Sequence, residues 1–353
     1  MQDVTRADLS RYTTLRLGGP AGDLRTVTEQ DEFVQTVRGL SGREPFLVLA
    51  GGSNVVIADE GLPGTVVLVR TAGVRIDAGD GDAVSLTVEA GQPWDDVVAE
   101  AVDAGVAGIE CLSGVPGSAG ATPIQNVGAY GQEVAEVIES VRVLDRATGT
   151  VRELSPAECE FSYRSSLFKR SDRRVVLAVT FKLWRSALSA PVRYPELARA
   201  LGVSAGERAP LADVRTAVLG LRAGKGMVLD PADRDTYSVG SFFMNPVLSQ
   251  ADFVALTVRA QQATGTAPTA WPGSDGSAKV SAAWLIERAG FAKGFDGGHP
   301  GVAVSSKHTL ALTNRGAGTT EALLDLARDI RDGVAKAFGV DLHPEPVLVG
   351  CSL

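Results

Sequence analysis

The sequence predicts an α+β protein of two or three domains, and three observations point to it. The chain has 353 residues, which is more than a single hydrophobic core usually holds. Its first half is rich in short apolar or alternating segments bounded by glycine, a pattern typical of strands. Beyond about residue 185 longer helical patterns dominate, so we place a domain boundary between residues 185 and 225.

The first half predicts a series of strands joined by tight turns. Strands are expected at 46–50, 55–59, 65–71, 84–91 and 175–183, and residues 141–154 form a hairpin around Ala-Thr-Gly. One helix is expected at 94–106, where apolar residues follow helical spacing and Gly105 provides a stop.

The second half predicts helices at 211–224, 251–263, 280–290 and 319–339. The last is the clearest, because Thr319 or Thr320 caps it, a continuous apolar stripe follows, and Gly339 ends it. Residues 302–314 suit a strand or hairpin, and PVLVG (346–350) predicts a short final strand.

Charge and cysteine usage exclude several classes of protein. The net charge of −8 disfavours a non-specific nucleic-acid binder. The polar N-terminus lacks the apolar stretch of a signal peptide, and no run of about 18 apolar residues predicts a membrane span. Cys111, Cys159 and Cys351 are odd in number and widely spaced, which argues against disulfides or a cysteine zinc site. We therefore expect a reduced cytoplasmic protein.

Two long glycine-rich loops are candidates for binding a cofactor. AGGSNVVIADEG (50–61) and SGVPGSAGATPIQNVGAYG (113–131) match neither the P-loop nor the Rossmann fingerprint. Glycines allow backbone N–H groups to converge on an anion. Further donors to a pyrophosphate or a heteroaromatic ring come from Ser53, Asn54, Ser118, Thr122, Gln125 and Asn126. The residues leave two readings open: ordinary turns, or a large dinucleotide held outside a Rossmann fold.

Three isolated residues have side chains suited to chemistry. Arg164, in YRSSLFK, has the rigid fork of donors that suits a carboxylate or enolate, and Glu345 is fixed between two prolines in HPEPVLVG. Ser241, in GSFFMNP, has neither a G-x-S-x-G elbow nor an S-x-x-K motif, which leaves a nucleophilic role weakly supported. A serine can instead protonate a strongly basic intermediate. Each of the three is also compatible with an ordinary structural position. The three histidines lack ligand spacing, so no metal site is predicted.

Together these motifs resemble one family, the UDP-N-acetylenolpyruvoylglucosamine reductases, flavoenzymes of bacterial peptidoglycan synthesis. The resemblance covers nearly the whole chain, and within the family it is to the longer-chain (type I) subtype. Seven segments follow the order of the family: TTLRLGGPA (13–21), the two glycine loops, YRSSLFK (163–169), GSFFMNP (240–246), DGSAKVSAAWLIERAG (275–290) and HPEPVLVG (343–350).

The resemblance implies a fold and a division of the chain. The fold is an FAD-binding fold of the vanillyl-alcohol oxidase type in two subdomains, followed by an α+β substrate-binding domain. The expected boundaries are 1–70 and 71–190 for the FAD-binding subdomains and 191–342 for the substrate domain, with the tail at 343–353 returning to the first subdomain.

The resemblance also implies the reaction. FAD takes a hydride from NADPH and passes it to the enolpyruvyl carbon distal to the carboxylate of the UDP-sugar. Ser241 then protonates the adjoining carbon, while Arg164 and Glu345 polarise the carboxylate. The implied FAD contacts are Gly51, Gly52, Ser53, Asn54, Gly114, Pro116, Gly117, Ser118, Gly120, Thr122, Gln125, Asn126, Gly128, Ala129, Tyr130 and Gly131.

Substrate contacts are implied at Tyr194, Lys225, Asn245 and Trp271. Trp271 stands where the longer-chain subtype can have a tyrosine, and Met244 replaces the lysine that the family often has in GSFF-Lys-Asn-Pro. We expect a monomer that binds neither nucleic acid nor membrane. Two alternatives remain: a flavin oxidase of the same fold, and a catalytically silent sensor of nucleotide sugars.

Overall fold

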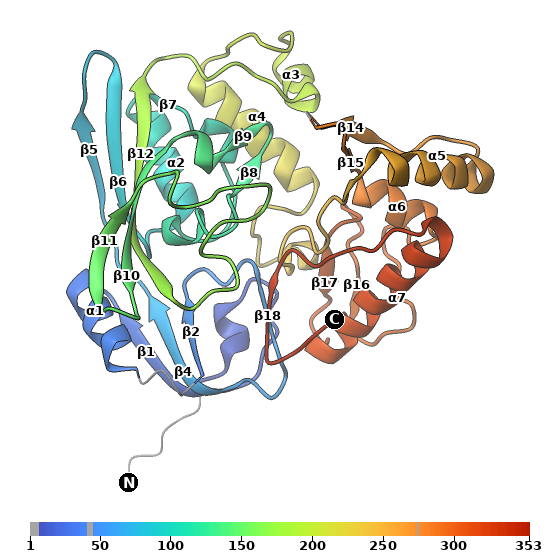
Figure 1. Cartoon of the computed structure of the whole chain (residues 1–353), viewed down its shortest axis with the longest axis horizontal. Helices are drawn as coiled ribbons and strands as arrows, with labels where there is room; N and C mark the ends of the chain where they lie inside the picture. Colours follow the sequence, from blue (N-terminus) through green and yellow to red (C-terminus); the bar gives the residue numbers. More distant parts are fainter. Residues whose placement is uncertain (1–6, 41–44, 274) are drawn as a thin grey trace. The chain divides into compact units, whose positions relative to one another are not determined.

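The computed structural model describes residues 7–40, 45–273 and 275–353, and the chain forms two compact units. The first unit is made mainly of Ala21–Gly52 and Leu62–Val228. The second unit combines Asp8–Pro20, Ser53–Gly61 and Leu229–Leu353, so two short N-terminal segments belong with the C-terminal half of the chain. Figure 1 shows the elements of both units.

A small parallel sheet begins the first unit. Its strands are β1 (Ala21–Val27), β4 (Leu62–Val69) and β2 (Phe46–Leu49), in the order β1-β4-β2. The amphipathic helix α1 (Gln30–Gly39) buries Phe33 and Val37 in one apolar core with Val67 and Val69 of β4. This packing places the end of β2, and residues 50–52 that follow it, at one edge of the sheet.

A larger antiparallel sheet completes the first unit (Figure 1). Its order is β11-β10-β12-β6-β5 and β7 also pairs with β12. The strands are β5 (Val74–Ala78), β6 (Ala83–Glu89), β7 (Val106–Ala107), β10 (Ile138–Asp145), β11 (Thr150–Leu154) and β12 (Arg174–Arg185). Helix α2 (Trp94–Asp103) shares the core of this sheet, with the Trp94 ring 5.5 Å from that of Phe181.

Two helices and a short hairpin are added to the first unit. The helices α3 (Pro195–Leu201) and α4 (Leu211–Gly224) share an apolar cluster that contains Leu197, Val214 and Val218. The strands β8 (Gly128–Ala129) and β9 (Gln132–Glu133) form the hairpin at the end of the second glycine loop.

The second unit packs three helices with short strands around its own core. Its helices are α5 (Gln250–Thr264), α6 (Ala282–Arg288) and α7 (Thr320–Phe338), and its strand pairs are β16 (Val302–Val304) with β17 (Leu312–Asn314) and β3 (Val55–Ile57) with β18 (Val347–Val349). A three-stranded sheet joins β13 (Val247–Leu248), β15 (Ala278–Val280) and β14 (Ala270–Pro272). Short 3-10 turns occupy Leu9–Tyr12, Glu110–Leu112, Ala119–Ala121, Val134–Glu136 and Arg234–Thr236.

The mixed content of helix and strand confirms the predicted α+β class. The caps expected for the clearest helix are present: Thr319 accepts the N–H of Ala322 at 3.1 Å, and Gly339 ends α7 with φ of 68°. Residues 1–6 lie outside the described residues. They belong to the polar start of the chain, on which the expectation of no signal peptide partly rests. In the part of the chain described, no helix is long and apolar enough to cross a membrane.

Candidate active site

In the first unit, Gly51 of the first glycine-rich loop meets Gly117 of the second loop at their backbones. A Cβ atom added to Gly51 would lie 2.6 Å from the Cα of Gly117, so only glycine fits at this crossing. Gly117 is held in turn by helix α2, because its carbonyl accepts the N–H of Trp94 at 3.0 Å. The two loops therefore touch at Gly51 and Gly117, with the second loop held by α2.

Ser118 follows this crossing and presents a buried hydroxyl. Ser118 is 3% exposed, and its Oγ has no hydrogen-bond partner within residues 7–40, 45–273 and 275–353. A buried hydroxyl without a partner is costly, which favours a bound polar group at this position. The next turn packs tightly, since a Cβ on Gly120 would lie 2.5 Å from the Cβ of Ala90.

The side chains of Thr122 and Asn126 hold the second loop in shape. Thr122 Oγ1 donates to the carbonyl of Ala119 at 2.8 Å. The amide nitrogen of Asn126 donates to Glu133 at 2.8 Å, and its oxygen accepts the N–H of Ala135 at 3.1 Å. Asn126 also has a positive φ of 47°, which asparagine tolerates better than most residues. These bonds fix the loop that carries Gln125, Gly128 and Ala129.

Arg164 is bound to the same loop through its guanidinium group. Its Nη1 donates to the carbonyl of Asn126 at 3.3 Å and its Nη2 to that of Gly128 at 2.9 Å. The backbone of Arg164 lies in the left-handed region with φ of 52°, and Lys169 Nζ donates to its carbonyl at 2.8 Å. The structure thus places the predicted arginine directly against the second glycine loop.

The structure brings together three residues that the sequence proposed separately, Tyr130, Tyr194 and Lys225. The rings of Tyr130 and Tyr194 make an edge contact with centroids 5.4 Å apart. Lys225 Nζ lies 5.7 Å from the centroid of the Tyr130 ring and 2.5 Å from Glu196 Oε2. Burial raises the pKa of Tyr130 to about 12, so its phenol is neutral near pH 7. Sequence inspection missed Glu196, because nothing in the local pattern of α3 shows that it faces α4.

Gly114 is anchored by an ion pair that sequence inspection also missed. Its N–H donates to Asp95 Oδ1 at 2.6 Å, while Arg215 bonds both oxygens of Asp95 at 2.7 and 2.9 Å. Burial by itself would raise the pKa of Asp95, but Arg215 and the Gly114 N–H hold that pKa below its usual range. Arg222 lies nearby with a buried Nε that has no partner among the described residues, and burial lowers its pKa.

In the second unit, Ser241 and Glu345 lie on neighbouring segments. The N–H of Glu345 donates to the carbonyl of Phe242 at 2.8 Å, and Phe243 pairs with Pro344 as an antiparallel bridge. Phe242 and Phe243 are 0% and 1% exposed, so their rings anchor the segment in the core. Ser241 itself is half-buried. The serine and the glutamate are therefore neighbours in the second unit, whereas Arg164 belongs to the first unit.

The remaining predicted substrate residues also lie in the second unit. Asn245 Oδ1 accepts the N–H of Ala282 at 2.9 Å and so supports the start of α6. Trp271 on β14 is 44% exposed, with Lys279 Nζ 5.8 Å from its ring centroid. Met244 continues the pairing of its segment, its N–H donating to the carbonyl of His343 at 3.0 Å.

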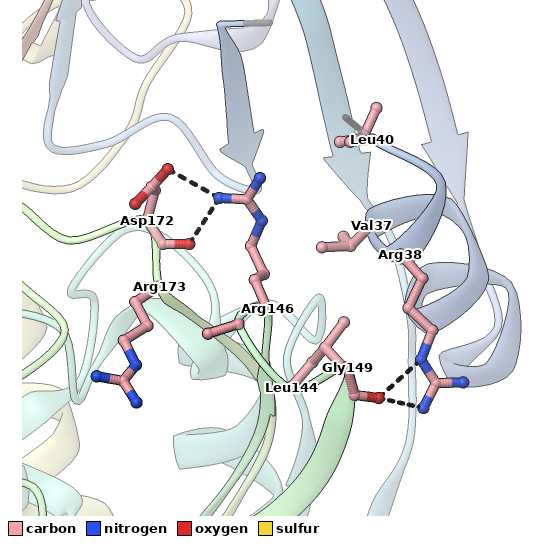
Figure 2. Close-up of a pocket in the computed structure, with 9 residues that line it drawn as sticks. Val37, Arg38, Leu40, Leu144, Arg146, Gly149, Asp172 and Arg173 are labelled. Carbon is pink, nitrogen blue, oxygen red and sulfur yellow. Dashed lines mark hydrogen bonds and ion pairs between the residues drawn. The ribbon is translucent and has the colours of Figure 1, made fainter. Parts of the chain in front are cut away.

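A cavity of about 350 Å³ lies elsewhere in the first unit (Figure 2). Its arginines hold the turn between β10 and β11: Arg38 donates to the carbonyl of Gly149 at 2.6 and 3.0 Å, and Arg146 to Asp172 Oδ2 at 2.8 Å. The lining consists of Val37, Arg38, Leu40, Leu144, Arg146, Ala147, Gly149, Asp172 and Arg173, which include none of the predicted site residues. Within the described ranges no cluster of side chains is suited to a metal ion.

Comparison with protein families assigns both parts of the chain. Residues 24–155 match the model described as FAD binding domain. Residues 230–349 match the model described as UDP-N-acetylenolpyruvoylglucosamine reductase, C-terminal domain. The two matched regions contain the first glycine loop, the second glycine loop and the serine and glutamate segments.

Similar proteins that match nearly the whole chain share one name. A UDP-N-acetylenolpyruvoylglucosamine reductase of Salinispora arenicola is 62% identical over 347 residues, covering 98% of this chain and 95% of that protein. One of Thermobifida fusca is 55% identical, covering 98% and 97%. The crystal structure of UDP-N-acetylenolpyruvylglucosamine reductase from Thermus caldophilus matches with a TM-score of 0.66 and 25% identity, covering 98% of each chain. At this identity and coverage, the chain belongs to the UDP-N-acetylenolpyruvoylglucosamine reductase family.

Proposed function

We propose that Arg164, Ser241 and Glu345 are the catalytic residues of this chain. As a member of its family the protein is an FAD-dependent oxidoreductase that reduces UDP-N-acetylenolpyruvoylglucosamine to UDP-N-acetylmuramate with NADPH, in peptidoglycan synthesis.

Residues of the two glycine loops fit FAD. The crossing of Gly51 and Gly117 leaves no room for a Cβ, and glycine backbone of this kind can present its N–H groups to a pyrophosphate. The buried Ser118 Oγ supplies a hydroxyl without a partner in the described chain. We assign the binding of FAD to the two loops, at 51–54 and 114–131. When bound, FAD supplies the hydride chemistry between NADPH and the enolpyruvyl carbon.

Ser241 is the proton donor in this proposal. Addition of a hydride to the distal enolpyruvyl carbon places negative charge on the carbon next to the carboxylate, which is then strongly basic. A serine hydroxyl can protonate such a centre when it is already in position, without a histidine beside it. The anchoring of Phe242 and Phe243 in the core supports this role, because it fixes the backbone next to Ser241.

Arg164 and Glu345 act on the carboxylate side of the substrate. A fixed guanidinium stabilises the charge that develops toward the carboxylate, and two carbonyl bonds hold that of Arg164 in place. Glu345 is held next to the serine segment by the bond of its N–H to Phe242. In this proposal Glu345 acts on the same enol-like intermediate.

The UDP-sugar is assigned to Tyr194, Lys225, Asn245 and Trp271. Lys225 carries the charge that suits a diphosphate, and the exposed Trp271 ring offers a stacking surface. We also propose that residues 1–70 and 71–190 form the two FAD-binding subdomains and that residues 191–342 form the substrate-binding domain. The tail at 343–353, whose strand β18 pairs with β3, returns to the first subdomain in this proposal. The protein is proposed to act as a cytoplasmic monomer that binds neither nucleic acid nor membrane.

The observation that carries the proposal is the pairing of the serine and glutamate segments, with the Glu345 N–H 2.8 Å from the Phe242 carbonyl oxygen. Anaerobic addition of NADPH to the flavin-loaded protein tests the reaction. NADPH should bleach the flavin, and the UDP-enolpyruvyl sugar should then reoxidise it. A flavin that NADPH leaves oxidised would contradict the reductase, and one reoxidised by oxygen but not by the sugar would favour the flavin oxidase.

A further inference from the structure

We infer that Glu196 is a positioning residue that acts through Lys225 and sets the affinity of the protein for the diphosphate of its substrate. In the structure Glu196 forms an ion pair with the ammonium group of Lys225, which is the group proposed to bind the diphosphate. Binding of the diphosphate therefore exchanges one anionic partner of Lys225 for another. The inference rests on the proposed role of Lys225 and assigns a function to a residue outside the predicted site.

The ion pair joins two helices of the first unit. Glu196 lies in the first turn of α3, and Lys225 is the residue that ends α4. Their side chains are 33% and 32% exposed and meet with Nζ 2.5 Å from Oε2. Solvent therefore reaches the pair, and an incoming anion can do so as well. Because α3 and α4 share an apolar cluster, both groups are held in register before any ligand arrives.

The same end of α3 is attached to the second glycine loop. Tyr194, the N-cap residue of α3, packs edge-on against Tyr130. Gly131 allows this approach, since a Cβ there would lie 3.2 Å from Arg193 Cβ. A second ion pair joins Arg193 Nη1 to Glu136 at 3.1 Å. Tyr194 and Glu196 thus lie two residues apart on one segment, and both contact the group formed by Tyr130 and Lys225.

The charges explain why Glu196 controls affinity. Lys225 lies beside the Tyr130 ring, whose face attracts a cation, and Glu196 supplies a full negative charge. A diphosphate offers more negative charge than one carboxylate, so it displaces Glu196, but the ion pair must first be broken. Glu196 therefore lowers the affinity for any anion that binds at Lys225.

The test is the affinity of the flavin-loaded protein for UDP, measured by titration calorimetry. Removal of the competing charge in Glu196→Gln should tighten UDP binding about twofold to fivefold, the range for an ion pair between partly exposed groups. The KM for the UDP-sugar should fall by the same factor with kcat unchanged. A structural role for Glu196 would instead weaken binding or leave it unchanged, and either result overturns the inference.

Two variants separate this inference from the function on which it rests. Glu136→Gln removes the same charge from a carboxylate that pairs with Arg193 of the same segment, and it should leave the UDP affinity unchanged. Lys225→Gln should weaken UDP binding, and adding Glu196→Gln to it should tighten UDP binding by a smaller factor than in the wild type, because only the direct repulsion between Glu196 and UDP is then removed. If Lys225→Gln binds UDP normally, the proposed role of Lys225 is wrong and the inference falls with it. If only the tightening by Glu196→Gln is missing, the role of Lys225 stands and the inference alone is wrong.

Discussion

Substitution of Gly51 by alanine should weaken FAD binding, because it separates the two loops that cross at this residue. The new Cβ would lie 2.6 Å from Gly117 Cα, whereas carbon atoms in contact prefer about 3.5–4.0 Å. The backbones must therefore move apart by roughly 1 Å. The Gly51 backbone lies outside the left-handed region, so the substitution tests space alone.

Overpacking of this kind costs about 1–3 kcal/mol. The empty loops relax this strain by moving apart, whereas bound FAD requires their original separation, so the cost falls on the bound state and corresponds to about a fivefold to 150-fold loss of FAD affinity. The assay is a titration of the deflavinated protein with FAD, followed by flavin fluorescence. Gly220→Ala is the matched control, because Gly220 lies in helix α4 with open space around its Cβ. The control should bind FAD normally and be slightly more stable. A folded Gly51→Ala protein with unchanged FAD affinity would refute the role of the loop crossing.

Substitutions at two further residues test groups that support the site. Asp95→Asn should lower the free energy of unfolding by about 1.5–3 kcal/mol in urea at pH 7, since Gly114 and Arg215 both lose a charged acceptor. Because the pKa of Asp95 is lowered in the folded protein, its contribution is complete above about pH 4 and is lost as the pH falls through that lowered pKa. The difference between wild type and variant should therefore shrink in acid, and a constant difference would count against the ion pair. Asn245→Ala should cost about 1 kcal/mol through the lost bond to Ala282, while Asn245→Asp, which keeps the acceptor, should retain stability in the same urea assay.

Much of the fold was predictable because its elements carry regular apolar patterns. Helix α7 and the hairpin of β10 and β11 lie where spacing and turn residues place them. Strand β1 and helix α1 were not predicted, because β1 alternates weakly, with only Ala21 and Val27 buried, and the buried face of α1 consists of just Phe33, Val34 and Val37. A periodic apolar pattern reports which face of a segment is buried, so it predicts a helix or strand poorly where that segment is buried only in part.

The site was predictable only as separate segments. The order of the motifs identified the loops and the serine and glutamate segments, but not their pairing. The contact of Gly51 with Gly117 and the ion pair of Glu196 with Lys225 depend on how distant elements pack. The left-handed backbones of Tyr130 and Arg164 likewise arise from the tertiary structure, since neither residue type favours that conformation.

The measurement that tests the central claim most directly is the pair of half-reactions of Ser241→Ala under anaerobic conditions. If Ser241 is the proton donor, NADPH should reduce the flavin of the variant at the wild-type rate, because that step needs no proton from Ser241. Reoxidation by the UDP-enolpyruvyl sugar, followed by stopped-flow absorbance, should then be blocked. Reoxidation and turnover at the wild-type rate would contradict the assignment of Ser241.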